Sequence, residues 1–252
     1  MSLKSIAKVV VDALGYEVRK KSNGFHADPF HDQRKLMSGR DVRVVLDLGA
    51  NVGQTAGAYL ALFPEATVHS FEPFAEPFQA LAALARANPR LRAHQLAVAD
   101  VTGTKAFFTN NNHVTNSLLP PAAGAVAYVA DDLLGQKGST EVPAITLDDF
   151  CAREQIDAVP VLKLDIQGGE LMALRGAESL LNRRAVDLIF TEVNFVPLYE
   201  GQAFFDDVYQ FLKARDYSLY GLYGLAHGTN GMLAWGDAIF IGPDLRRSLD
   251  RR

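Results

Sequence analysis

Residues 44–53 have the sequence VVLDLGANVG, in which an apolar strand runs directly into a glycine loop and a helix start. Gly49 allows a tight turn that a Cβ atom would obstruct, and Gly53 allows the helix to approach the strand or a ligand closely. A glycine loop after an apolar strand is a usual place for an adenosine-bearing ligand. The segment therefore predicts a nucleotide-binding α/β fold.

Strands and helices alternate along most of the remaining chain. Repeated βα units with short connections predict a doubly wound, mostly parallel sheet whose ligands bind beyond the carboxyl ends of the strands. Residues 103–139 show no regular pattern. The predicted strands are 42–48, 66–71, 91–98, 141–146, 160–165, 185–192, 217–223 and 234–242, and the predicted helices are 53–63, 75–87, 147–155, 169–182 and 202–215.

Three regions are expected along the chain. Residues 1–40 hold an N-terminal accessory helix, over 2–14, and a polar connector. The helix carries an apolar stripe that predicts either a lid or a subunit contact in a homo-oligomer. Residues 41–243 form the cofactor-binding domain, and residues 244–252 are expected to be a solvated charged tail.

The composition excludes several classes of protein. The chain has 252 residues, 48% hydrophobic and 21% charged, which is typical of a soluble globular protein. A formal net charge of −4 leaves no basic excess for nucleic acid. No apolar run is long enough for a signal peptide or a membrane span, so no membrane is expected as a partner. Cys151 is the only cysteine, which excludes an internal disulfide and fits a reducing cytoplasm.

Two carboxylates flank the glycine loop and indicate which adenosine ligand it binds. A nicotinamide fingerprint requires a glycine where this chain has Asn51, and Asp47 would repel a pyrophosphate. Asp47 would instead attract an ammonium group, which S-adenosylmethionine carries at its methionyl end. Glu72 ends a strand 23 residues after Gly49, where an acid accepts both ribose hydroxyls. The alternative for these acids is structural, with Asp47 as a loop cap and Glu72 as a solvated strand end.

Six further motifs give the chain a resemblance to one family. The sequence resembles the FkbM family of S-adenosylmethionine-dependent methyltransferases over about residues 30–243. TLDDF followed by KLDIQGGE at this separation is the most specific feature. The family has an acid where this chain has Gln167, so we expect that position not to be required for the chemistry. The motifs are VVLDLGANVGQT, FPEATVHSFEP, LAVADVTGTKAFF, TLDDF, LKLDIQGGELMALRGAESLL and AIFIGP.

The resemblance implies a class I methyltransferase sheet of the Rossmann-like type and O-methylation of a hydroxyl on a saccharide or secondary metabolite. Leu96 and Ala97 are expected along the adenine, with Asp100 near them, and Ser117 near the cofactor or in an ordinary turn. By the same resemblance, the residues that bind S-adenosylmethionine are Asp47, Gly49, Asn51, Gly53 and Glu72.

Methyl transfer from a sulfonium needs a positioned acceptor and, for a sugar hydroxyl, a base or a metal ion. Asp165 ends the apolar strand VLKLD at the crevice, and Glu192 ends the presumed adjacent strand. The two carboxylates are expected to share a proton or hold a divalent cation, although Asp165 is also placed to cap a helix. His227, in GLYGLAHGTNGM, and His113 are the histidine candidates for a base. No residue is assigned as a metal ligand.

Two other functions remain open from the sequence. A non-catalytic module would keep the adenosine pocket for binding alone, but the presence of both acids and both glycines argues against it. An N-methyltransferase usually carries an Asn/Asp-Pro-Pro-Tyr run, and this chain has none. The acceptor is expected to be a small molecule.

Overall fold

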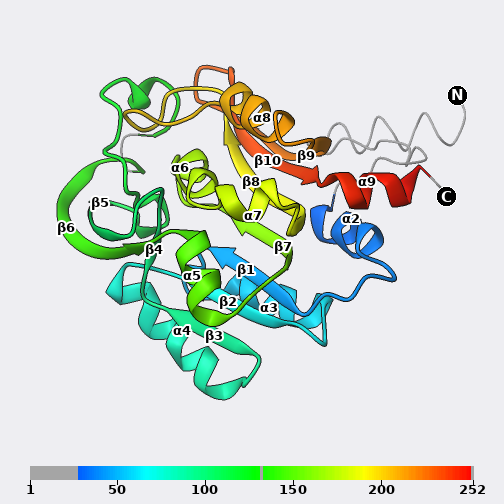
Figure 1. Ribbon diagram of the computed structural model, residues 1–252. Coiled ribbons are helices and arrows are strands. Elements are labelled where there is room, and N and C mark those ends of the chain that lie inside the picture. The colour runs from blue at the N-terminus through cyan, green and yellow to red at the C-terminus, as the bar shows by residue number, and fades with distance from the viewer. Residues whose placement is uncertain (1–27, 131–132, 251–252) are drawn as a thin grey trace, which may run out of the picture.

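The computed structural model describes residues 28–130 and 133–250, so the predicted helix over 2–14 lies outside the described residues (Figure 1). Its centre is a seven-stranded sheet with the order β3-β2-β1-β7-β8-β10-β9. β10 runs in the opposite direction to the other six strands and pairs antiparallel with β8 and β9. The predicted doubly wound, mostly parallel sheet is confirmed. Its strands are β1 (Val44–Leu48), β2 (Thr67–Phe71), β3 (Leu91–His94), β7 (Val159–Leu164), β8 (Val186–Asn194), β9 (Ser218–His227) and β10 (Leu233–Ile241).

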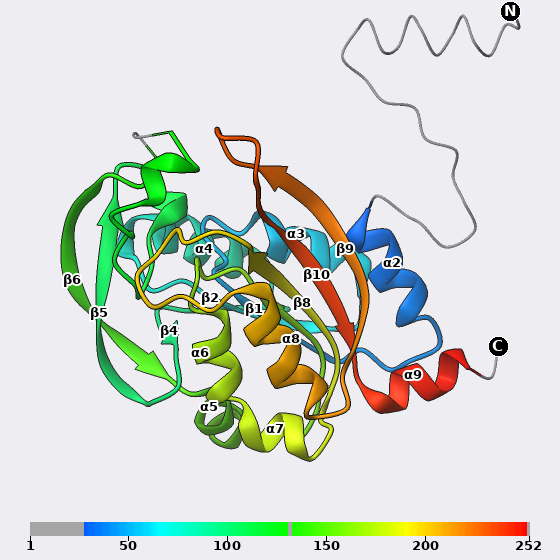
Figure 2. The same ribbon diagram turned by 90° about the horizontal axis from the view of Figure 1, so that it is seen from above.

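Helices cover both faces of this sheet (Figure 2). Successive strand residues point to opposite faces, so Leu46 and Leu162 pack with α5–α8, whereas Val45 and Val161 pack with α2–α4 and α9. This arrangement buries both faces, as a parallel sheet requires. The helices are α2 (Pro29–Leu36), α3 (Gln54–Leu62), α4 (Ala75–Ala87), α5 (Leu147–Glu154), α6 (Glu170–Arg175), α7 (Glu178–Asn182), α8 (Phe205–Lys213) and α9 (Pro243–Leu249).

A second, three-stranded sheet takes in both ends of the predicted irregular region. It has the order β4-β6-β5, with β4 (Ala97–Val98), β5 (Gly103–Asn110) and β6 (Gln136–Ile145). The predicted strand 91–98 is therefore divided between the two sheets. Only Phe107 and Asn110 are buried in β5, so the sequence carries no repeated apolar alternation there. Between β5 and β6 lie two short 3-10 helices, η1 (His113–Thr115) and η2 (Ala125–Ala127).

The structure also corrects both ends of the predicted domain. The connector contains α2, whose Leu36 is buried against the sheet. Residues 243–249 form α9 and bury Leu245 completely, so this part of the expected charged tail is packed rather than solvated. Within the described residues, no helix combines the length and apolar character needed to cross a membrane.

Candidate active site

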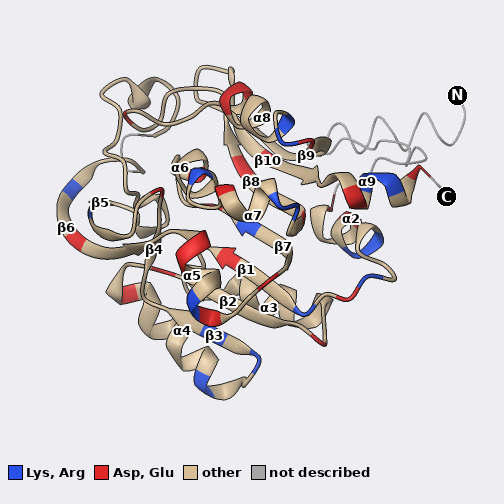
Figure 3. Cartoon of the chain, viewed as in Figure 1, with Lys and Arg blue, Asp and Glu red and all other residues tan. Residues whose placement is uncertain are grey.

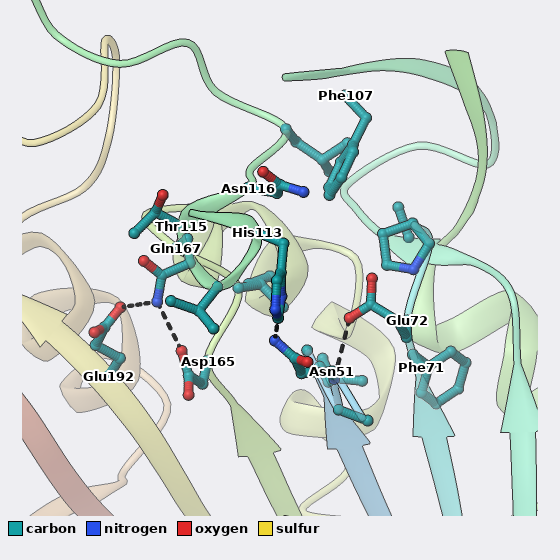
Figure 4. A pocket seen from close by; sticks show the side chains of 18 of the residues that line it. Asn51, Phe71, Glu72, Phe107, His113, Thr115, Asn116, Asp165, Gln167 and Glu192 are labelled. Carbon is teal, nitrogen blue, oxygen red and sulfur yellow. Dashed lines mark hydrogen bonds between the residues drawn. The ribbon is translucent and has the colours of Figure 1, made fainter. Parts of the chain in front are cut away.

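A cavity of about 460 Å³ opens at the carboxyl ends of β1, β2, β7 and β8 (Figure 4). Glu72 and Phe71 lie at one end, Asp165 and Glu192 lie at the other, and His113 lies between them. This volume is within the range of about 300 to 1,000 Å³ that is common for small-molecule sites. The predicted site residues in its lining are Gly49, Asn51, Glu72, Leu96, Ala97, Asp165 and Glu192.

The glycine loop follows β1 and is held against β7. Gly49 has a φ of +72°, and a Cβ atom there would lie 1.8 Å from the carbonyl oxygen of Asp165. Gly53 has a φ of +96° and starts α3, where a Cβ atom would lie 2.7 Å from Leu84 Cδ1. Both positions therefore require glycine, as the sequence predicts. Gly53 supports the loop without lining the cavity.

Glu72 and Asn51 join the loop to the end of β2. Glu72 accepts hydrogen bonds from the backbone N–H groups of Asn51 (3.1 Å) and Phe74 (2.8 Å). Burial raises the pKa of Glu72, and these two hydrogen bonds oppose that rise. Asn51 Oδ1 is buried with no hydrogen-bond partner among the described residues. The cavity thus offers an unused acceptor beside a carboxylate, which fits the donors of a nucleoside and an amino acid.

Asp47 lies beneath the cavity rather than in its wall. Its carboxylate is fully buried, accepts a hydrogen bond from Ser70 Oγ (3.0 Å) and lies 3.2 Å from Lys163 Nζ. Lys163 also donates to the carbonyl oxygens of Leu48 and Gly49, each at 3.0 Å. Because Lys163 neutralises Asp47, the structure gives Asp47 a positioning role in place of the expected contact with an ammonium group.

The sequence reasoning missed Lys163, which faces Asp47 directly in the β1–β7 register. Burial lowers the pKa of Lys163, but the Asp47 and Asp165 carboxylates outweigh that effect and raise it overall. Figure 3 shows the basic band of β7 beside the acidic bands on β1 and β8. A lysine inside the otherwise apolar run VPVLKL was the available signal, since a buried charge requires a partner.

The Gln167 side chain connects the two predicted catalytic carboxylates. Its Nε2 donates to Asp165 Oδ1 at 2.9 Å and to Glu192 Oε2 at 3.2 Å (Figure 4). Its Oε1 lies 2.9 Å from the hydroxyl of Tyr199, which also lies 2.9 Å from the carbonyl oxygen of Thr115. Gln167 was expected to have no part in the chemistry, yet it lies at the centre of the site.

Several acids around this pair have raised pKa values. Burial and the negative charges of Asp165, Glu170 and Asp237 raise the pKa of Glu192 well above its usual range. Burial raises the pKa of Glu170 to about 7, and burial with the charge of Asp165 raises that of Asp237 to about 6. Raised carboxyl pKa values in a cavity are typical of groups that exchange protons near neutral pH.

Glu170 has a second role in the loop before α6. It accepts a hydrogen bond from the backbone N–H of Ile166 at 2.9 Å and is almost completely buried. Its contact with the loop adds a structural reason for an acid at this position.

Three other predicted site residues lie outside the cavity lining. Asp100 pairs with Lys105 at 2.9 Å on the surface. Ser117 is buried and donates from Oγ to the carbonyl oxygen of Gln167 at 2.7 Å. His227 is exposed at the end of β9, because most of the predicted glycine-rich loop is strand. His113, the other histidine candidate, does line the cavity, and its Nδ1 lies 3.4 Å from Asn51 Nδ2.

No group of three or more His, Cys, Asp or Glu side chains is arranged to hold a metal ion in residues 28–130 and 133–250. Asp165 and Glu192 face the same amide, and Gln167 already donates to one oxygen of each. The Gln167 amide therefore lies between the two carboxylates, where the sequence analysis also allowed a shared divalent cation.

The sequence matches the family described as Methyltransferase FkbM domain over residues 47–219. That range holds the glycine loop, Glu72 and the Asp165–Glu192 pair. The chain belongs to this family. The FkbM methyltransferase domain uses S-adenosylmethionine as its methyl donor, and the predicted family, enzyme class and cofactor are confirmed.

Two curated relatives of this FkbM domain have names that refer to an O-methylated or O-demethylated position. It is 28% identical over 168 residues to the 2-O-methyltransferase NoeI of Sinorhizobium fredii, covering 63% of this chain and 66% of that protein. It is 32% identical over 171 residues to the 31-O-demethyl-FK506 methyltransferase FkbM of Streptomyces tacrolimicus, covering 59% and 66%. The matched region thus spans just under two thirds of each relative.

Solved structures of methyltransferases are also similar to this FkbM domain, at low sequence identity. An rRNA methylase from Streptococcus thermophilus is 10% identical, with a TM-score of 0.47, and the match covers 86% of this chain and 98% of that one.

Proposed function

We propose that this protein transfers a methyl group from S-adenosylmethionine to a hydroxyl group of a small molecule. The observation that carries the proposal is the Asp165–Gln167–Glu192 group, which faces the same cavity as the glycine loop. The names of both relatives refer to an O-methylated or O-demethylated position, which supports an oxygen acceptor.

We assign the two ends of the cavity to the two reactants. Glu72 would accept the ribose hydroxyls, Asn51 Oδ1 would accept a donor of the methionyl part, and Leu96 and Ala97 would lie along the adenine. When bound, S-adenosylmethionine supplies a methyl group already activated by its sulfonium. The chain therefore needs no covalent nucleophile and acts by orienting the acceptor.

The carboxylate end would hold the acceptor hydroxyl and receive its proton. The Asp165 side chain is 46% exposed, whereas Gln167 fixes one of its oxygens. The second oxygen lies 3.8 Å from Lys163 Nζ, and we assign it to the acceptor hydroxyl. As the acceptor oxygen bonds to the methyl carbon, the carbon–sulfur bond would break, S-adenosylhomocysteine would leave with the electron pair on sulfur, and the hydroxyl proton would pass to the Asp165–Glu192 pair. Positioned acid–base groups of this kind contribute about 10² to 10⁴-fold to a rate.

A change at Asp165 tests the proposal. Purified protein is first incubated with labelled S-adenosylmethionine and a panel of uncharged hydroxyl compounds, and we expect a methyl ether as the product. Asp165→Asn should then lower kcat by at least about 10²-fold, because it removes the charge and keeps the size. Cofactor affinity and melting temperature should stay unchanged.

A control variant shows whether the loss of kcat is specific to Asp165, and two outcomes would contradict the proposal. Asp206→Asn removes an exposed carboxylate in the first turn of α8 and should leave kcat unchanged. A fully active Asp165→Asn variant would remove the carboxylate from the mechanism. Methyl transfer to amines alone would favour N-methylation.

A further inference from the structure

Among the described residues, the cavity lining contains three carboxylate side chains and no lysine or arginine. These side chains are Glu72, Asp165 and Glu192. Lys163 lies beneath this end, 3.8 Å from Asp165 Oδ2, but it is 4% exposed and is already bound to Asp47 and two carbonyl oxygens. An anionic acceptor would therefore meet two carboxylates at the catalytic end and no accessible lysine or arginine. Like charges in such a site cost binding free energy because little water screens them.

An apolar cluster forms part of the wall at this same end of the cavity. Tyr199, whose hydroxyl lies 2.9 Å from Gln167 Oε1, belongs to a cluster built from residues 119–129, 133–134, 196–199 and 234–235. The cluster joins parts of the chain that are far apart in the sequence. Its members that also line the cavity are Val129, Leu133, Leu134, Leu198, Tyr199 and Trp235.

The apolar character continues onto the surface around the cavity. Six large apolar side chains are exposed in the described part of the chain, and four of them lie in residues 113–130 or in the β9–β10 hairpin. These four are Val114, Val126, Leu225 and Met232. The two segments touch, since Thr229 N donates to the carbonyl oxygen of Tyr128 at 2.9 Å. Figure 2 shows the hairpin tip beside the 113–130 segment.

We propose that the acceptor is an uncharged molecule that carries its hydroxyl on a broad apolar body. This inference rests on the proposed function and specifies its substrate class. The hydroxyl would reach Asp165 and Glu192 while the apolar body packs on the Tyr199 cluster and extends toward Val114. A free sugar has no apolar body to cover this wall, and a sugar phosphate would add an unpaired anion beside the two carboxylates.

Trp235 provides a direct measurement, because it is the only tryptophan of the chain and lines the cavity. The full chain with S-adenosylhomocysteine is titrated with three probes below their micelle concentrations, and the Trp235 fluorescence is recorded. The probes are octyl glucoside, methyl glucoside and octyl sulfate. We expect octyl glucoside to bind at least about tenfold more tightly than either of the others.

Two matched variants test whether charge at this end sets the preference. Val114→Lys places a cation in the lining at a position that is 48% exposed, so folding should be unaffected. It should strengthen octyl sulfate binding by at least about fivefold and weaken octyl glucoside binding. Val101→Lys makes the same change at a 59% exposed position outside the lining and should alter neither.

The outcomes separate this inference from the proposed function. Equal binding of the three probes, or tighter binding of octyl sulfate by the unmodified chain, would overturn the apolar, uncharged acceptor. So would methyl transfer to a sugar phosphate in the labelled-cofactor screen, which would leave the O-methyltransferase proposal intact. Selective octyl glucoside binding with transfer only to amines would overturn the proposed function and leave the apolar site standing.

Discussion

Gln167 has a left-handed backbone conformation and directs its amide at both Asp165 and Glu192. Its φ is +57°, a left-handed value that costs a residue with a Cβ atom about 1 to 2 kcal/mol. In this conformation its amide donates to both Asp165 and Glu192, and its own carbonyl oxygen accepts from Ser117. Gln167 therefore links the two carboxylates to the segment that contains Ser117.

Changing Gln167 to glutamate tests this role. Gln167→Glu replaces the two N–H donors with a third acid, which raises the pKa of Glu192 further. We expect the acid limb of the pH dependence of kcat to move up by about one unit and kcat near neutral pH to fall about tenfold. Gln155→Glu is the control, since Gln155 also has a φ of +57° but is exposed at the end of α5. An unchanged pH profile would return Gln167 to a structural role.

At the scale of elements, the ends of β1 and β7 form one unit. Asp165 N donates to the carbonyl oxygen of Leu48 at 3.2 Å, and Lys163 binds the carbonyl oxygens of Leu48 and Gly49. The loop that would bind the cofactor is thereby fixed relative to the acid that would bind the acceptor. In-line methyl transfer depends on that relative position.

Gly49→Ala tests the contact between these two strand ends. The new Cβ atom would lie 1.8 Å from the Asp165 carbonyl oxygen at a φ of +72°. We expect the free energy of unfolding in urea to fall by at least about 2 kcal/mol. Gly57→Ala, in α3 with no atom within 4 Å of its Cβ position, should raise it by about 0.5 to 1 kcal/mol. Equal effects of the two changes would show that β1 and β7 do not meet at Gly49.

At the scale of the whole molecule, the sequence predicts the central sheet because its strands repeat a strong apolar pattern. Val45 and Leu46 face opposite layers of the core, and neither is exposed. The second sheet was missed because β5 offers only Phe107 and Asn110 as buried positions.

Local spacing was also enough to place Gly49, Asn51 and Glu72 at the cavity. Contacts between distant segments explain what the sequence could not predict. Gln167 and Tyr199 lie 32 positions apart and meet only in the folded chain.

The acids of the site should make the whole protein more stable at mildly acidic pH. The pKa of Glu170 rises from 4.5 to about 7, and that of Asp237 rises from 3.8 to about 6. Between these limits the folded state binds more protons than the unfolded state, so the free energy of unfolding falls as pH rises. His69 and His94 act in the opposite direction, because burial lowers the pKa of both, that of His69 from 6.5 to about 4. Burial also raises the pKa values of Glu72 and Glu192, so the acids with raised pKa values outnumber these two histidines.

Urea unfolding of the protein at several pH values between about 5 and 8 measures this balance. We expect stability to decline from pH 5 to pH 7 by about 1.4 kcal/mol per pH unit for each net proton lost. Glu170→Gln keeps an oxygen that accepts from Ile166 N but does not titrate, so its decline should be shallower. His69→Phe keeps an aromatic ring and removes the opposing titration, so its decline should be steeper. The same pH dependence in all three proteins would show that neither Glu170 nor His69 titrates as their burial requires.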